Sequence, residues 1–111
     1  MPSTSDLKPF TFQKQPLEKE IISVDFSRRI PAGVTIAAQT VVSELWNNSP
    51  ELIANMTGTL LQVSGIAVVR KVLSCMITDG SGGYNYRVTF TVTLSDGQVK
   101  QDEVFVTVKE D

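Results

Sequence analysis

The strongest constraint on this chain is a run of alternating side chains over residues 84–94. Large apolar or aromatic side chains occupy every second position, namely Tyr84, Tyr86, Val88, Phe90, Val92 and Leu94. Asparagine, arginine and threonine fill the positions between them. A helix would scatter the large side chains around its axis, whereas a β-strand places all of them on one face. The run therefore predicts a strand with one buried face and one face toward water.

A second strand returns beside this one. The sequence "SDGQ" at 95–98 is a hairpin signal, because Gly97 adopts a positive φ without a Cβ clash. The return segment carries Phe105 on one face and, on the other, Val104, Val106 and Val108. Residues 84–109 are therefore predicted to form an antiparallel hairpin. Its charged stretch "KQDE" at 100–103 is of the kind that protects an exposed sheet edge.

Weaker alternation predicts further strands. One face of a half-buried strand carries Ile22, Val24 and Phe26, and residues 8–14 predict a short edge strand or an extended arm. Residues 34–46 also fit a strand, and a helix over 37–46 is the alternative. Their threonine, isoleucine and valine content favours the strand.

Two more strands are expected over 59–65 and 66–78, joined near Ser64 and Gly65. Neither face of the second is wholly apolar, which indicates a strand that is covered on both sides.

Two loops separate these segments. Residues 47–58 are rich in Asn, Ser and Gly, and they predict a loop with a single helical turn that starts at Ser49, with Pro50 first in the helix. The glycine-rich "TDGSGG" at 78–83 leads into a strand rather than a helix, and it lacks the lysine of a phosphate-binding loop. It is therefore predicted to turn the chain.

About seven short strands and no long helix predict an all-β fold, namely an antiparallel immunoglobulin-like β-sandwich. A small barrel is the alternative. We expect residues 1–7 to form a flexible N-terminal segment and residues 8–111 to form one sandwich domain.

Composition argues against catalysis. The chain has no histidine and one cysteine, which removes the commonest general base and any internal disulfide. Cys75 lies in an apolar run and is expected to be a buried, inert thiol. Asp102 and Glu103 fall on opposite strand faces, so they cannot act together on a substrate. We expect no catalytic residues.

No cofactor or metal is expected either. Asp79 and Asp96 lack the spacing of a calcium loop and fit turns instead. The net charge of −2 makes nucleic acid a poor partner, and no apolar stretch is long enough to span a membrane. The N-terminus lacks the pattern of a signal peptide.

Several motifs together resemble a known family. They are Asp25-Phe26, residues 33–36 ("GVTI"), Gly82-Gly83 with Tyr86, Val88 and Thr89, Ser95 with Gly97, and the valines of the last strand. Over residues 15–109 the sequence resembles small phage or prophage immunoglobulin-like proteins known as fiber–tail adaptors or tail-associated structural proteins. Nothing in the region of residues 47–62 has a recognised counterpart.

The resemblance implies a non-enzymatic assembly role with protein partners in a phage tail. We expect a location in the virion, or in the host cytoplasm before assembly, and the pattern of the N-terminus predicts no secretion by a signal peptide. We expect docking through loops and strand edges, with residues 8–14 and 99–109 as candidate edges, and possible self-association in a symmetric particle. The alternative is a carbohydrate-binding or adhesion module, whose aromatic candidates are Trp46, Tyr84 and Tyr86. The pattern puts both tyrosines on the core side, and exposure of two of the three would favour this alternative.

Overall fold

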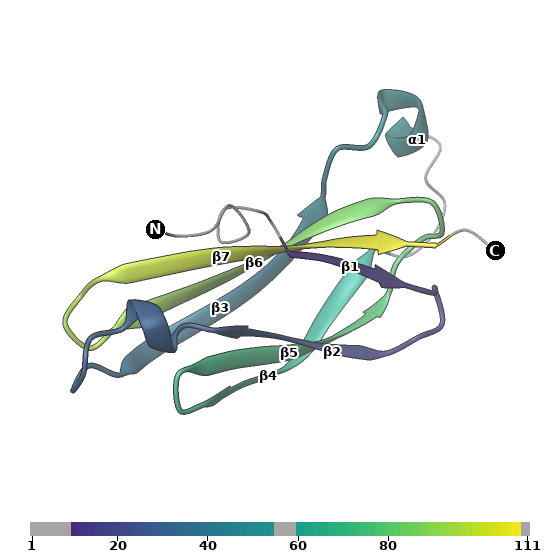
Figure 1. Cartoon of the computed structure of the whole chain (residues 1–111). Helices are drawn as coiled ribbons and strands as arrows, with labels where there is room; N and C mark the ends of the chain where they lie inside the picture. The colour runs from purple at the N-terminus through teal and green to yellow at the C-terminus, as the bar shows by residue number, and fades with distance from the viewer. Residues whose placement is uncertain (1–9, 55–59, 110–111) are drawn as a thin grey trace.

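The computed structural model describes residues 10–54 and 60–109 (Figure 1). The segment over 1–7 that we expected to be flexible lies outside the described residues. Within these described residues, one short helix, α1 (Pro50–Ala54), and a 3-10 helix (Ser27–Arg29) accompany seven strands. The strands are β1 (Phe10–Lys14), β2 (Glu20–Asp25), β3 (Ile36–Leu45), β4 (Leu61–Val69), β5 (Val72–Asp79), β6 (Asn85–Leu94) and β7 (Val99–Val108).

The strands form two sheets, in the orders β1-β7-β6-β3 and β2-β5-β4. Neighbours are antiparallel except for β1 and β7, which are parallel. If the strands are lettered A to G in chain order, the sheets become A-G-F-C and B-E-D, which is the immunoglobulin arrangement with its first strand beside its last. This order confirms the predicted sandwich, and the two separate sheets rule out the barrel.

The core lies between the two sheets and is built around β6. The alternating run predicted from the sequence is confirmed: all six of its large side chains are buried, and Val88, Phe90 and Val92 have no exposed surface. From the opposite sheet β5 contributes Leu73, Cys75 and Ile77. The valines of β7 on the same face as Val104 are also buried, which confirms the hairpin prediction.

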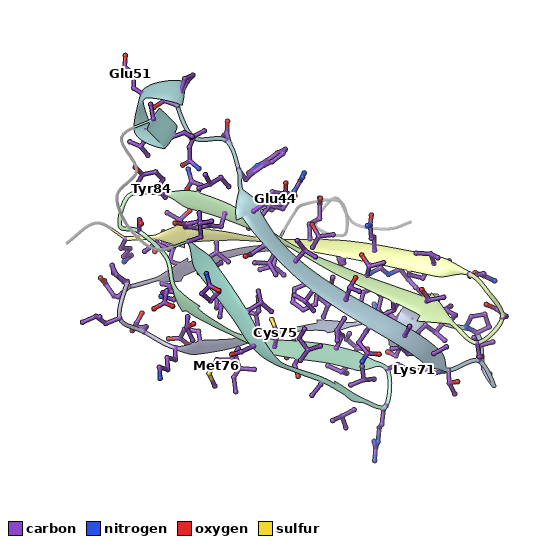
Figure 2. The ribbon with its side chains drawn as sticks, turned by 180° about the vertical axis from the view of Figure 1, so that it is seen from behind. Glu44, Glu51, Lys71, Cys75, Met76 and Tyr84 are labelled. Atoms are coloured by element: carbon purple, nitrogen blue, oxygen red, sulfur yellow. The ribbon has the colours of Figure 1, made fainter. Side chains whose placement is uncertain are left out.

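The predicted position of the turn between the fourth and fifth strands, near Ser64 and Gly65, is wrong. The chain turns at Arg70 and Lys71, where Arg70 has a φ of 58° (Figure 2 labels Lys71). Gly65 lies inside β4 with a φ of 59°, at a point where the pairing register with β5 shifts between Ser64 and Ala67. The glycine therefore makes a β-bulge, which bends a strand without ending it. The segment over 66–78 that seemed covered on both sides is the end of β4 joined to nearly all of β5.

The predicted edge over residues 99–109 is only half correct. Residues 104–107 pair with β6 on one side and with β1 on the other, so they lie inside the sheet. Residues Val99–Glu103 have no strand on their outer side among the described residues. There the Arg29 guanidinium donates to the Gln101 carbonyl and to the Asp102 carboxylate, both at 3.1 Å. β1 is an edge strand, as predicted for residues 8–14, of which 8 and 9 lie outside the described residues.

A hydroxyl group fixes the glycine-rich loop. Tyr86, near the start of β6, accepts a hydrogen bond from the Ser81 main-chain N–H at 2.9 Å. A tyrosine in this place, bonded to the backbone just upstream, is the tyrosine corner of immunoglobulin-like domains. In the same loop Gly80 has a φ of 91°, and a Cβ there would lie 2.8 Å from the Val108 side chain. The loop therefore turns the chain, as predicted, and it needs glycine to do so.

Lys14 is buried, which is rare for lysine. Its ammonium group donates to the carbonyl oxygens of Gln15, Pro16 and Asp79 at 2.7, 3.0 and 2.6 Å. Three acceptors match the three donors of an ammonium group. Burial lowers the pKa of Lys14, and the nearby carboxylates oppose this effect. The side chain thus ties the end of β1 to the end of β5, in the opposite sheet.

We expect Tyr86→Phe to lower the free energy of unfolding by about 1–3 kcal/mol, because a buried hydrogen bond at the corner is lost while the ring remains. Urea unfolding followed by circular dichroism measures this change. Tyr84→Phe is the matched control: its hydroxyl donates to the carbonyl of Leu52, and because the side chains of α1 are exposed, water can reach this carbonyl and replace the lost donor. Equal losses in the two variants would contradict a special role for the corner.

Lys14→Met should also cost about 1–3 kcal/mol, because methionine keeps the aliphatic stem but leaves the carbonyl groups without this donor. Lys109→Met, at an exposed position beside the same strand end, serves as the control and should leave stability nearly unchanged. A Lys14→Met variant as stable as the wild type would show that the buried ammonium group does not stabilise the fold.

Candidate interaction surface

The outer face of the four-stranded sheet gathers side chains from three strands into rows. The pairing register places Glu44 beside Arg87 and Arg87 beside Phe105. The rows that follow along the strands are Val42, Thr89 and Glu103; Thr40, Thr91 and Gln101; and Ala38, Thr93 and Val99. Each row therefore joins residues that are far apart in the sequence.

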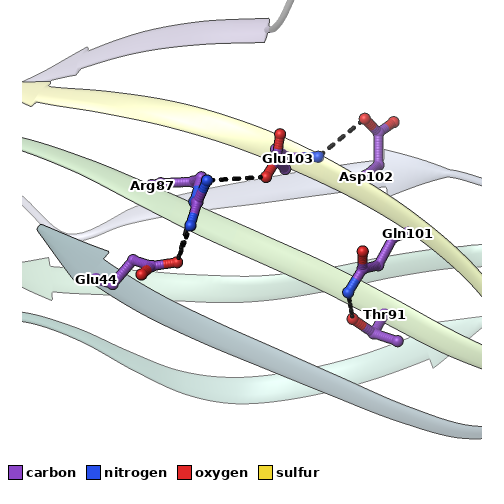
Figure 3. A network of polar contacts seen from close by, with 6 residues as sticks. All are labelled: Glu44, Arg87, Thr91, Gln101, Asp102 and Glu103. Atoms are coloured by element: carbon purple, nitrogen blue, oxygen red, sulfur yellow. Dashed lines mark hydrogen bonds and ion pairs between the residues drawn. The ribbon is translucent and has the colours of Figure 1, made fainter. Parts of the chain in front are cut away.

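Five residues at one end of this face form what we call the Trp46 cluster: Trp46, Arg87, Phe105, Glu44 and Glu103. The Arg87 guanidinium lies 4.3 Å from the centre of the Trp46 ring, whose centre is 5.6 Å from that of Phe105. Arg87 Nε donates to Glu44 Oε1 at 3.0 Å, and Arg87 Nη1 lies 3.5 Å from Glu103 Oε2 (Figure 3). The arginine is thus held by a carboxylate from each neighbouring strand and by a ring.

This arrangement positions side chains more than it stabilises the fold. Exposed ion pairs contribute roughly 0–1 kcal/mol each, and both glutamates here are more than two-fifths exposed. What the cluster provides is a tryptophan, 41% exposed, whose orientation is restricted by Arg87 and Phe105. Tryptophan and arginine are the residue types enriched where protein interfaces bind most strongly.

Beyond the cluster, the outward-facing residues of β3, β6 and β7 carry no charge. Thr89, Thr91 and Thr93 are partly buried, and Val42 and Val99 are 58% and 60% exposed. Among the outward-facing residues of β3, β6 and β7, the three charges all belong to the Trp46 cluster. A weakly charged face with exposed valines desolvates at little cost, which suits it to contact with another protein.

The loop between β3 and β4 projects from the end of the sandwich at which the Trp46 cluster lies (Figures 1 and 2). Asn48 and the main chain of Asn85 exchange two hydrogen bonds, at 2.8 and 2.9 Å, and the Tyr84 hydroxyl donates to Leu52 O at 2.6 Å. The predicted helical turn is confirmed as α1, where Ser49 Oγ accepts from the Leu52 N–H. Residues 55–59 of this loop lie outside the described residues.

The aromatic platform of the carbohydrate alternative does not form. Tyr84 and Tyr86 are 9% and 1% exposed, as the alternation predicted, and of the three candidates only Trp46 reaches solvent. Sequence reasoning missed the Trp46 cluster, because its members come from separate strands. The alternation does put Arg87 outside, opposite the buried face, but nothing in the sequence states which residues lie beside it.

The acidic residues singled out from the sequence are dispersed. Asp79 and Asp96 lie beyond opposite ends of β6, and Asp96 accepts a hydrogen bond from the Gln98 N–H. Asp102 contacts Arg29 while Glu103 contacts Arg87, on opposite faces of β7.

In the part of the chain that the structure describes, no group of three or more His, Cys, Asp or Glu residues could hold a metal ion. Within that part no helix is long and apolar enough to cross a membrane.

Cys75 is confirmed as a buried thiol, 1% exposed between the sheets. Burial raises the pKa of Cys75 to about 11, because the thiolate would lose its hydration. The nucleophilic form is therefore scarce near neutral pH.

Comparison with known proteins identifies a family. A family model described as "Podophage GP4 fiber-tail adaptor protein gp77" matches residues 14–107, which is most of the chain. No curated protein matches the chain.

Alkylation of Cys75 at pH 8 should be at least about 100-fold slower in the native protein than in the urea-unfolded chain, since a pKa two units higher reduces the thiolate fraction by that factor. Iodoacetamide labelling followed by mass spectrometry measures both rates. Similar rates in the two states would mean that the thiol is reachable in the folded protein.

Proposed function

The chain belongs to the podophage GP4 fiber-tail adaptor family, whose members are phage tail structural proteins, and we propose that it is a non-enzymatic module joining two protein components of the tail. The family match carries this proposal, because it covers β2 to β6 completely and nearly all of β7. A virion location follows from the same role.

The outer face of the four-stranded sheet is the docking face in this proposal. Protein interfaces combine a poorly charged centre with one or a few large anchors in fixed orientations. The Trp46 cluster supplies the anchor, and the threonine rows with Val42 and Val99 supply the poorly charged surface. The outer face of the other sheet has exposed apolar residues such as Ile21 and Val69, but it holds no comparable fixed aromatic group among the described residues.

The absence of histidine and the burial of Cys75 support a role without catalysis. An acid–base pair needs two titratable groups that face one substrate, and Asp102 and Glu103 face opposite sides. The ionised groups of the outer face are instead bonded to one another around Arg87.

Binding to the tail and fiber proteins of the same phage tests the proposal. We expect the wild type, immobilised on a biosensor, to bind one of each, and Trp46→Ala to weaken one of these complexes about 30-fold or more, equivalent to about 2 kcal/mol. Ile21→Ala is the control, since Ile21 is 66% exposed on the other sheet and should leave both affinities unchanged.

If the wild type binds neither tail nor fiber proteins, the adaptor role is wrong. If Ile21→Ala weakens binding and Trp46→Ala does not, the module docks through the three-stranded sheet instead.

A further inference from the structure

Most sheet edges of this protein carry a protective feature. β4 contains the bulge at Gly65, and β1 and β2 are only five and six residues long. The first half of β7 carries charged side chains. Arg29 donates a hydrogen bond to the Gln101 carbonyl, which points away from β6. Short length, bulges and charges are the usual means by which natural sheets avoid pairing with other strands.

β3 is the exception. It is ten residues long, and Ile36–Ser43 contains no charged residue and no proline. Its side chains at Ala37, Ala38, Gln39, Thr40 and Val42 are exposed. A long, uncharged and exposed edge of this kind is a template for another strand.

The free part of this edge has defined limits. At one end the register with β6 shifts between Ile36 and Ala38. At the other end β4 comes close, because Ser43 Oγ donates to the Leu61 carbonyl at 2.8 Å. The regular stretch to which no described strand pairs on this side is therefore Ala38–Val42, with Thr40 as its midpoint; its Val41–Val42 end borders a groove that β4 also lines.

The hydrogen-bonding groups of this stretch point in alternating directions. The Trp46 N–H donates to Asn85 O at 3.0 Å, which marks a hydrogen-bonded position next to β6. Because such positions alternate along an antiparallel pair, Ala38, Thr40 and Val42 also bond toward β6. The main-chain N–H and C=O groups of Gln39 and Val41 therefore point to the free edge.

We propose that a second copy of this chain pairs with the free edge of β3, antiparallel, about a two-fold axis at Thr40. Gln39 of one copy then exchanges hydrogen bonds with Val41 of the other. The side chain of Ala38 lies opposite the larger Val42, and Thr40 lies opposite its own counterpart, which is a favourable cross-strand pair. A charged side chain at the centre would face its own copy and repel it, so the lack of charge here specifically permits self-pairing.

This self-pairing does not depend on the adaptor role. A stretch of five residues buries less surface than a stable dimer needs, so we expect a weak dimer that becomes populated only at high protein concentration. A covalent trap is therefore the appropriate test, and it uses the purified full chain without any tail protein.

Thr40→Cys should form a disulfide-linked dimer under mild oxidation. Residues opposite one another at a non-hydrogen-bonded position have Cα atoms about 4.5 Å apart, within the range that a disulfide spans. Val42→Cys is the register control, because the two Val42 positions would be offset by four residues, roughly 13 Å. Ala67→Cys is the edge control, at an exposed position on β4. The native Cys75 is buried, so we expect it not to cross-link in any of the three variants.

We expect Thr40→Cys to cross-link at least about ten times faster than either control, as measured on non-reducing gels. Light scattering over a concentration series should show a dimer fraction that Ala38→Lys abolishes and Ala67→Lys retains. Equal cross-linking rates in the three variants, a faster rate in either control, or a strict monomer at the highest attainable concentration would each overturn the proposal.

Discussion

Burial of the inward face of β6 holds the two sheets together. β6 lies in the middle of its sheet, between β7 and β3, and its large side chains meet those of β5 across the sandwich. Each such side chain stabilises the fold by about 1.5–3 kcal/mol when it is fully buried. A slip of one residue in pairing would turn all of them toward water, so this burial fixes the register of both neighbouring strands. The same register brings Glu44 and Phe105 to the two sides of Arg87.

The glycine-rich loop between β5 and β6 is held by groups from three other parts of the chain. Lys14 donates to the Asp79 carbonyl, Tyr86 accepts from the Ser81 N–H, and the Val108 side chain fills the space where Gly80 lacks a Cβ. These contacts join β1, β6 and β7 at one end of the sandwich. The glycine-rich loop, whose glycine content resembles that of a phosphate-binding loop, therefore connects the two sheets and contacts β1, β6 and β7.

The parts of the fold that depend on local pattern could be predicted from the sequence, and those that depend on distant pairing could not. Strict alternation over residues 84–94 predicts β6 and its buried face, and Gly97 predicts the hairpin turn. Both are local properties, because one is the periodicity of a single strand and the other is the conformational freedom of a single residue. Gly65 was misread because a glycine with positive φ serves a bulge as well as a turn, and only the partner strand distinguishes the two. The pairing of β1 with β7 and the Trp46 cluster were missed for a related reason, since each joins residues from strands far apart in the chain.

The parallel pairing of β1 with β7 determines how the domain responds to mechanical load. The chain enters β1 at Phe10, opposite Val104, and both strands run in the same direction to Lys14 and Val108 (Figure 1). A force that pulls the beginning of the chain away from its end acts along these strands and must slide them past each other. All hydrogen bonds between the two strands then resist together, and the buried ammonium group of Lys14 adds its contacts at the end of β1. A hairpin pulled at its open end, such as β6 with β7, instead loses its bonds one after another. Tension between the start of β1 and the end of β7 therefore loads this strand pair in shear, with all its hydrogen bonds acting together.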